Sequence, residues 1–137
     1  MRILIAEDEK RASRGLRNLI MMVSDKHEIV GEAADGKEAF ELMKLLEPEV
    51  VFTDIKMPYM DGIALIRAAR AQDMKTKFVI ISAYEEFELA RQAISLGVTD
   101  YLVKPLVPED IEDIIQRLEE YNSITWDKEN RNLKSRY

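Results

Sequence analysis

The sequence predicts an α/β protein in which five helices flank one parallel sheet of five strands, in the order 2-1-3-4-5. Two observations predict this doubly wound fold. Short apolar runs alternate five times with amphipathic segments of helical length, which is the pattern of βαβ units. The crossovers of such units are right-handed, which leaves few topologies. The order given above puts the two strands that end in acidic residues at the centre of the sheet.

Two strand–helix pairs are expected in the first third of the chain. A continuous apolar run at 2–6 predicts a buried strand, and apolar residues at helical spacing predict a helix over about 10–23. A shorter apolar run at 29–33 predicts a weaker strand at an edge of the sheet. Asp35 is suited to cap the next helix, which Pro48 would stop.

The third strand carries the residue on which the functional interpretation depends. Residues 50–53 are apolar or β-branched, and Asp54 follows them directly. Breakers on both sides bound this run, as expected for a fully buried parallel strand. Asp54 alone would more often cap a turn. Its role therefore depends on what the other strand ends bring to it.

Three helices and two strands are expected after Asp54. A helix should begin at Asp61-Gly62 and end near Ala71, before a buried strand at 78–81. A short helix over about 87–94 precedes a strand at 99–103. Pro108 and the acidic residues after it suit the first turn of a last helix.

Composition limits the possible functions. The 137 residues suffice for one domain, and the absence of cysteine excludes disulfides and thiolate metal sites. The net charge of −6 argues against nucleic-acid binding over the whole surface. No apolar run approaches the ~20 residues of a membrane span. The apolar start is too short for a signal peptide, so we expect a cytoplasmic protein without membrane contact.

Charged and hydroxyl residues follow four of the predicted strands. Glu7 and Asp8 follow the first, Asp54 ends the third, Ser82 follows the fourth and Lys104 follows the fifth. The carboxyl ends of parallel strands meet at one edge of the sheet, so these side chains should surround one crevice. Three carboxylates there repel one another unless a cation intervenes, and Mg²⁺ prefers such ligands. With an ammonium and a hydroxyl beside them, they predict phosphoryl chemistry, for which aspartate is a known nucleophile.

These motifs, in this order and spacing, resemble the receiver domains of two-component response regulators, which have a flavodoxin-like fold related to the chemotaxis regulators. The resemblance extends from residue 2 to about residue 120. It rests on Glu7-Asp8, Asp54, Met57-Pro58, Asp61-Gly62, Ser82-Ala83, Tyr101 and Lys104-Pro105. We therefore expect a receiver domain at 1–120 and a linker or helical tail at 121–137.

The resemblance implies a set of metal ligands. Asp54 matches the phospho-acceptor, which also binds Mg²⁺. Asp8 matches a direct ligand, and Glu7 matches a residue that acts through water. The backbone carbonyl of Lys56 matches the third protein ligand. Glu7 stands where the family most often has aspartate.

The resemblance also implies a switch. Lys104 would pair with a phosphoryl oxygen, and Pro105 matches a usually cis proline. Ser82 would move towards the phosphoryl group, and Tyr101, the switch aromatic, would turn inward. The face formed by the helix at 87–94, the strand at 99–103 and the last helix would then change its preference for partners.

The resemblance implies a signalling domain that is no enzyme beyond its own phosphorylation and dephosphorylation. Its phosphoryl donor would be a sensor histidine kinase, and its output face could form a homodimer. The motif at 82–87 and the segment at 97–101 resemble receivers attached to AraC-type helix-turn-helix output domains, which control transcription. DNA would be bound only through such an output domain.

Other functions stay open. The chain could be a stand-alone receiver or a phosphorelay intermediate. A receiver that is not phosphorylated is excluded only by inference, since every required residue is present. A haloacid-dehalogenase-type phosphatase also uses an Asp nucleophile with Mg²⁺, but needs a second Asp where this chain has Lys56. A nucleotide-binding flavodoxin-like protein needs a glycine-rich loop after the first strand, where Glu7-Asp8-Glu9 would repel phosphate.

Three further residues are singled out. Lys56 and Tyr84 flank the predicted site, each two residues from one of its members, and both are bulky. We expect them to shield the phosphoryl group from water and to prolong the phosphorylated state. His27, the only histidine, is interpreted as a surface residue and not as a phosphate carrier.

Overall fold

Strands and helices alternate along the whole of the computed structural model, which describes residues 1–83 and 86–134, with the backbone alone for Phe87 and for residues 122–134. The elements are β1 (Arg2–Ala6), α1 (Lys10–Val23), β2 (Glu28–Ala33), α2 (Gly36–Leu46), β3 (Val50–Asp54), α3 (Gly62–Ala71), β4 (Lys77–Ser82), α4 (Phe87–Ile94), β5 (Asp100–Val103) and α5 (Pro108–Lys134). Each predicted strand and helix is present. The bounds of β2, β4 and β5 differ by one residue from those expected.

The five strands form one parallel sheet in the order β2-β1-β3-β4-β5, which confirms the predicted fold class. The weaker strand β2 lies at an edge, as expected. Ala6 pairs with Thr53, and Asp54 pairs with Ile81. Ser82 pairs with Val103. The carboxyl ends of β1, β3, β4 and β5 therefore lie along the same edge of the sheet.

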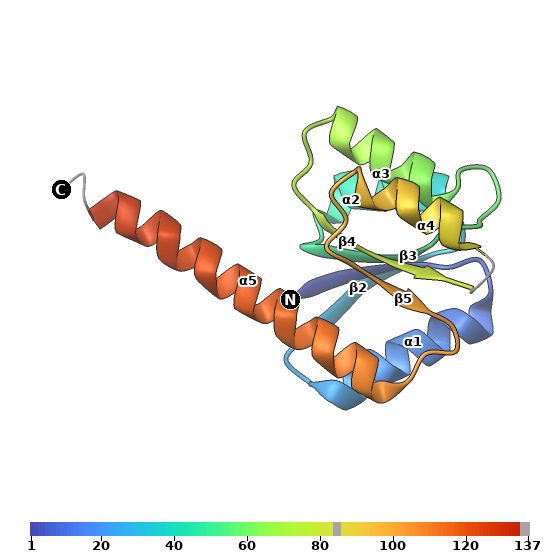
Figure 1. Ribbon diagram of the computed structural model, residues 1–137, viewed down its shortest axis with the longest axis horizontal. Coiled ribbons are helices and arrows are strands. Elements are labelled where there is room, and N and C mark those ends of the chain that lie inside the picture. Colours follow the sequence, from blue (N-terminus) through green and yellow to red (C-terminus); the bar gives the residue numbers. More distant parts are fainter. Residues whose placement is uncertain (84–85, 135–137) are drawn as a thin grey trace.

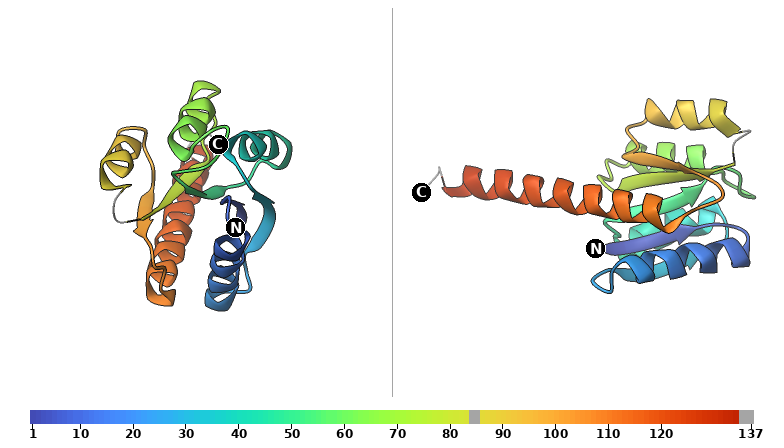
Figure 2. Two further views of the ribbon diagram at one scale, coloured as in Figure 1. Left: turned by 90° about the vertical axis from the view of Figure 1, so that its right-hand side faces the viewer. Right: turned by 60° about the horizontal axis from the view of Figure 1, so that its bottom comes forward.

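Helices cover both faces of the sheet (Figures 1 and 2), with α1 and α5 on one face and α2, α3 and α4 on the other. Alternate residues of each strand supply the two cores. Phe52 and Val79 are buried against the α1–α5 layer, while Val51 and Ile80 are buried against the α2–α4 layer. Because both faces are covered, β1 and β4 carry unbroken apolar runs at residues 3–6 and 78–81.

Side-chain caps fix where two of the helices begin. The Glu38 N–H donates a hydrogen bond to Asp35 Oδ1 over 2.8 Å, which confirms the cap expected before α2. The Ala64 N–H donates to Asp61 Oδ1, also over 2.8 Å, at the start of α3. The second cap matters for function because α3 begins only a short loop after Asp54.

Helix α5 continues beyond residue 120, where the receiver domain was expected to end, as far as Lys134. At about 1.5 Å per residue, a helix of 27 residues is about 40 Å long. Its second half projects away from the sheet and the other helices (Figure 1). None of the helices in residues 1–83 and 86–134 is both long and apolar enough to cross a membrane.

The interpretation of His27 as a surface residue is wrong, because the residue is only 5% exposed. Its Nδ1 lies 2.9 Å from the amino group of Met1, and its Nε2 lies 2.9 Å from Glu119 Oε1 on α5. Burial and the charge of the chain terminus lower the pKa of His27 below its ordinary value, while Glu119 opposes this effect. The two contacts join segments far apart in the chain, so local sequence patterns do not reveal them.

Candidate functional site

Three carboxylates meet at the carboxyl edge of the central strands. Glu7 and Asp8 follow β1, and Asp54 is the last residue of β3. One oxygen of each lies within 4.8 Å of the other two. Glu7 and Asp54 are buried, whereas Asp8 is exposed. The cluster therefore opens to solvent on the side of Asp8.

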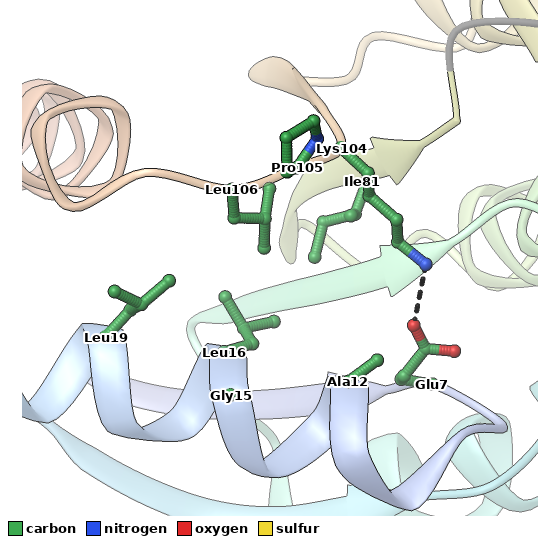
Figure 3. A pocket seen from close by; sticks show the side chains of 9 residues that line it. All are labelled: Glu7, Ala12, Gly15, Leu16, Leu19, Ile81, Lys104, Pro105 and Leu106. Carbon is green, nitrogen blue, oxygen red and sulfur yellow. Dashed lines mark hydrogen bonds and ion pairs between the residues drawn. The ribbon is translucent and has the colours of Figure 1, made fainter.

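Lys104, directly after β5, bridges two of these carboxylates. Its Nζ lies 2.9 Å from Glu7 Oε1 and 2.8 Å from Asp54 Oδ2 (Figure 3 shows the contact with Glu7). The Lys104 N–H donates a hydrogen bond to the Ser82 carbonyl over 2.8 Å, which fixes the start of the loop. The peptide bond between Lys104 and Pro105 is cis, as the resemblance implied.

The backbone around Asp54 is tightly packed. The Ile55 N–H donates to Asp54 Oδ1 over 2.7 Å and so orients the carboxylate. The Gly62 N–H donates to the Ile55 carbonyl over 2.7 Å. A Cβ atom on Gly62 would lie 2.2 Å from the Asp54 carbonyl oxygen, so only glycine allows α3 to begin this close to the end of β3.

Charges at the site perturb one another. Burial raises the pKa of Glu7 to about 7; Lys104 opposes this effect, while Asp8 and Asp54 add to it. Burial alone would lower the pKa of Lys104, but Asp54 and Glu7 outweigh it and raise that pKa. The three carboxylates repel one another, and a bound divalent cation would offset that repulsion. Mg²⁺ suits this site because it prefers oxygen ligands.

The other predicted residues lie around this cluster. Ser82 is fully buried at the end of β4, beside β3. Tyr101, on β5, is half-buried and packs against the core on the α2–α4 side. Lys56 is exposed in the loop after β3. Tyr84, which was expected to shield the phosphoryl group together with Lys56, lies outside the described residues.

An apolar groove of about 260 Å³ adjoins the cluster. Figure 3 shows its two walls: Ala12, Leu16 and Leu19 line one along α1, and Leu106 lies opposite them. Glu7 and Lys104 form the end of the groove at the site. Its remaining lining residues are Gly15, Ile81 and Pro105.

One buried acidic residue near the site was not predicted to have a role. Glu86 precedes α4 and is only 8% exposed. Its Oε2 accepts a hydrogen bond from the Ala83 N–H over 3.2 Å, and its Oε1 lies 3.8 Å from Lys56 Nζ. Sequence alone shows a glutamate in a polar stretch, with no periodic signal that it is buried.

Comparison with known proteins identifies the family. The sequence pattern of the response regulator receiver domain matches residues 3–116. The chain belongs to the response regulator receiver domain family. Its fold also matches the receiver domain of AraT, a response regulator from Geobacillus stearothermophilus, with 35% sequence identity and a TM-score of 0.80. That match covers 91% of this chain and 97% of the AraT domain.

Two curated relatives differ in length from each other. The receiver is 38% identical over 119 residues to the transcriptional regulatory protein YesN of Bacillus subtilis. This match covers 87% of this chain but only 32% of YesN. The receiver is also 32% identical over 117 residues to the chemotaxis protein CheY of Thermotoga maritima. That match covers 85% of this chain and 96% of CheY. The chain thus spans about a third of one relative and almost all of the other.

Proposed function

We propose that this receiver domain accepts a phosphoryl group on Asp54 from a phosphorylated histidine of a sensor kinase. The observation that carries the proposal is the contact of Asp54 with Lys104 inside a cluster of three carboxylates. A carboxylate oxygen of Asp54 attacks phosphorus, the phosphorus–nitrogen bond of the donor breaks, and the departing imidazole nitrogen keeps the bonding electron pair. The product is an aspartyl-phosphate.

The residues of the site have separate roles in this reaction. The Ile55 N–H orients the attacking carboxylate, and Lys104 carries positive charge to the phosphoryl oxygens. Ser82 supplies a hydroxyl donor at the neighbouring strand end. Glu7, Asp8, Asp54 and the Lys56 carbonyl would hold Mg²⁺. When bound, Mg²⁺ offsets the negative charge of the carboxylates and of the phosphoryl group.

The apolar groove between α1 and the loop at 105–106 supports a protein as the donor. Apolar side chains line the groove, and its end lies at Glu7 and Lys104. A donor that packs into it would bring its phosphorylated histidine to the site. A small phosphodonor needs no such contact, so the two kinds of donor distinguish docking from chemistry.

We further propose that phosphorylation changes the face formed by α4, β5 and α5, through Ser82 and Tyr101, and that two copies pair through this face. Residues 121–137 would connect the domain at 1–120 to an output domain. The match to only a third of YesN, a transcriptional regulatory protein, favours that arrangement. The match to nearly all of CheY favours a stand-alone receiver as the second candidate.

Phosphorylation is tested by incubation with phosphoramidate and Mg²⁺, followed by measurement of the intact mass. A gain of one phosphoryl group is expected in the wild type and in an Asp25→Ala control, whose aspartate lies in the loop before β2. The gain should be absent in Asp54→Ala. A gain that survives Asp54→Ala would mean that another residue is the acceptor.

A further inference from the structure

Glu86 is a buried carboxylate that the proposed chemistry does not use. Acidic side chains at the start of a helix are usually solvated, yet this one is 8% exposed. Its Oε2 accepts the Ala83 N–H, and its Oε1 faces Lys56 Nζ. A buried charge is costly unless such partners compensate it, so Glu86 depends on these two donors.

The two donors flank Asp54. Lys56 lies two residues after Asp54 in the loop that follows β3, and Ala83 follows Ser82 at the end of the neighbouring strand β4. Asp54 and Ile81 are paired in register, so the two loops leave the sheet side by side. Glu86 therefore joins the loop that follows Asp54 to the loop after the neighbouring strand β4.

Glu86 also holds the backbone that positions Ser82. The Glu86 N–H donates to the Ala83 carbonyl over 3.0 Å, while the Glu86 side chain accepts the Ala83 N–H. The backbone and the side chain of Glu86 thus both bind Ala83, directly before α4 begins at Phe87. A displacement of the Glu86 side chain would loosen both Ser82 and the first turn of α4.

We propose that Glu86 is an internal anion that occupies these donors while Asp54 is unphosphorylated, and that the phosphoryl group displaces it. A phosphoryl group carries a charge of about −1.5 to −2 and several acceptor oxygens, so it repels Glu86 and competes for Lys56 and for the Ala83 N–H. Its arrival frees Ala83 and the start of α4 from their contacts with Glu86. This inference rests on the proposed function and adds a restraint that phosphorylation releases.

Coupling of this kind works in both directions. If phosphorylation releases Glu86, then prior removal of the Glu86 charge favours phosphorylation. Glu86→Gln removes the charge but keeps the side-chain length and an oxygen that can accept the Ala83 N–H. Glu88→Gln is the matched control, because Glu88 lies in the first turn of α4 with its side chain 81% exposed and paired with Arg91 at the surface.

The test combines two measurements. Phosphoryl uptake from phosphoramidate with Mg²⁺ is followed by intact mass, and amide hydrogen exchange of residues 87–90 is followed in the unphosphorylated protein. Glu86→Gln should raise the ratio of phosphorylated to unphosphorylated protein reached at a fixed phosphoramidate concentration, and should accelerate the hydrogen exchange, each by about fivefold or more, the lower range for coupling between sites. Glu88→Gln should match the wild type. Lys56→Met removes the partner cation without changing α4 and should also accelerate the exchange, which covers the case that Glu86→Gln does not fold.

The outcomes separate the two proposals. If Glu86→Gln takes up phosphoryl as Glu88→Gln does, or if Lys56→Met leaves the exchange of residues 87–90 unchanged, Glu86 is only a helix cap and the inference is overturned, while the proposed function stands. If the wild type itself gains no phosphoryl mass, the proposed function fails, and the displacement of Glu86 by a phosphoryl group fails with it.

Discussion

Replacement of Gly62 by alanine tests whether the close approach of α3 to β3 shapes the site. The new Cβ would lie 2.2 Å from the Asp54 carbonyl oxygen and 3.1 Å from Ile55 Cα, and both atoms belong to the backbone. No side-chain rotation relieves such contacts. The start of α3 and the end of β3 must separate by about 1 Å to restore van der Waals distances.

The cost of this separation follows from two effects. Overpacking of a rigid site costs about 1–3 kcal/mol. The hydrogen bond from the Gly62 N–H to the Ile55 carbonyl lengthens beyond its 2.7 Å, and its loss costs about 0.5–1.5 kcal/mol. We expect Gly62→Ala to lower the free energy of unfolding by about 2–4 kcal/mol, out of about 5–15 kcal/mol for a domain. A displacement of this size beside Asp54 should also slow phosphoryl uptake by up to about 100-fold.

Urea unfolding at equilibrium measures the first effect, as a lower midpoint at unchanged slope. Gly15→Ala is the matched control, because Gly15 lies in the interior of α1 and a Cβ there meets nothing within 4 Å. That change should stabilise the protein by about 0.5–1 kcal/mol through helix propensity. A Gly62→Ala variant as stable as Gly15→Ala, with unchanged phosphoryl uptake, would refute the reasoning.

Three further predictions concern other parts of the molecule. Ala12→Arg puts a charged side chain into the apolar groove and should slow phosphoryl transfer from a phosphorylated sensor kinase at least about tenfold. Phosphoryl uptake from phosphoramidate, measured by intact mass, should stay unchanged. Equal slowing of both reactions would contradict docking in the groove. The pKa of His27 is lowered in the folded protein, so the unfolded chain binds more protons as the pH falls through 6.5, and the free energy of unfolding decreases. Urea unfolding between pH 7.5 and pH 5.5, with Mg²⁺ present, should show a smaller decrease of this free energy for His27→Gln than for the wild type. Lys56→Ala and Tyr84→Ala should each shorten the lifetime of the phosphorylated protein, measured by loss of phosphoryl mass over time, and an unchanged lifetime in both would exclude shielding.

The fold could be predicted because its signals are local and repeated. Strands such as β4 carry an unbroken apolar run because both faces of the sheet are covered, and the helices carry apolar residues at their own period. The acidic residues that follow β1, the one that ends β3 and the lysine after β5 could then be brought together from topology alone. The structure adds that Lys104 contacts both Glu7 and Asp54 directly.

Residues whose roles depend on a single distant partner could not be found in this way. His27 is buried against the chain terminus and Glu119 on α5, and Glu86 is buried where Lys56 and the Ala83 N–H provide donors. Neither burial leaves a periodic pattern, since each involves one charged side chain. The contacts of His27 and of Glu86 join segments that the order of strands and helices brings near one another. That order does not determine which side chains in those segments meet. Breaking the Glu86 contacts is costly because it would leave a buried charge without partners, so its release requires the competing charge of a phosphoryl group at Asp54.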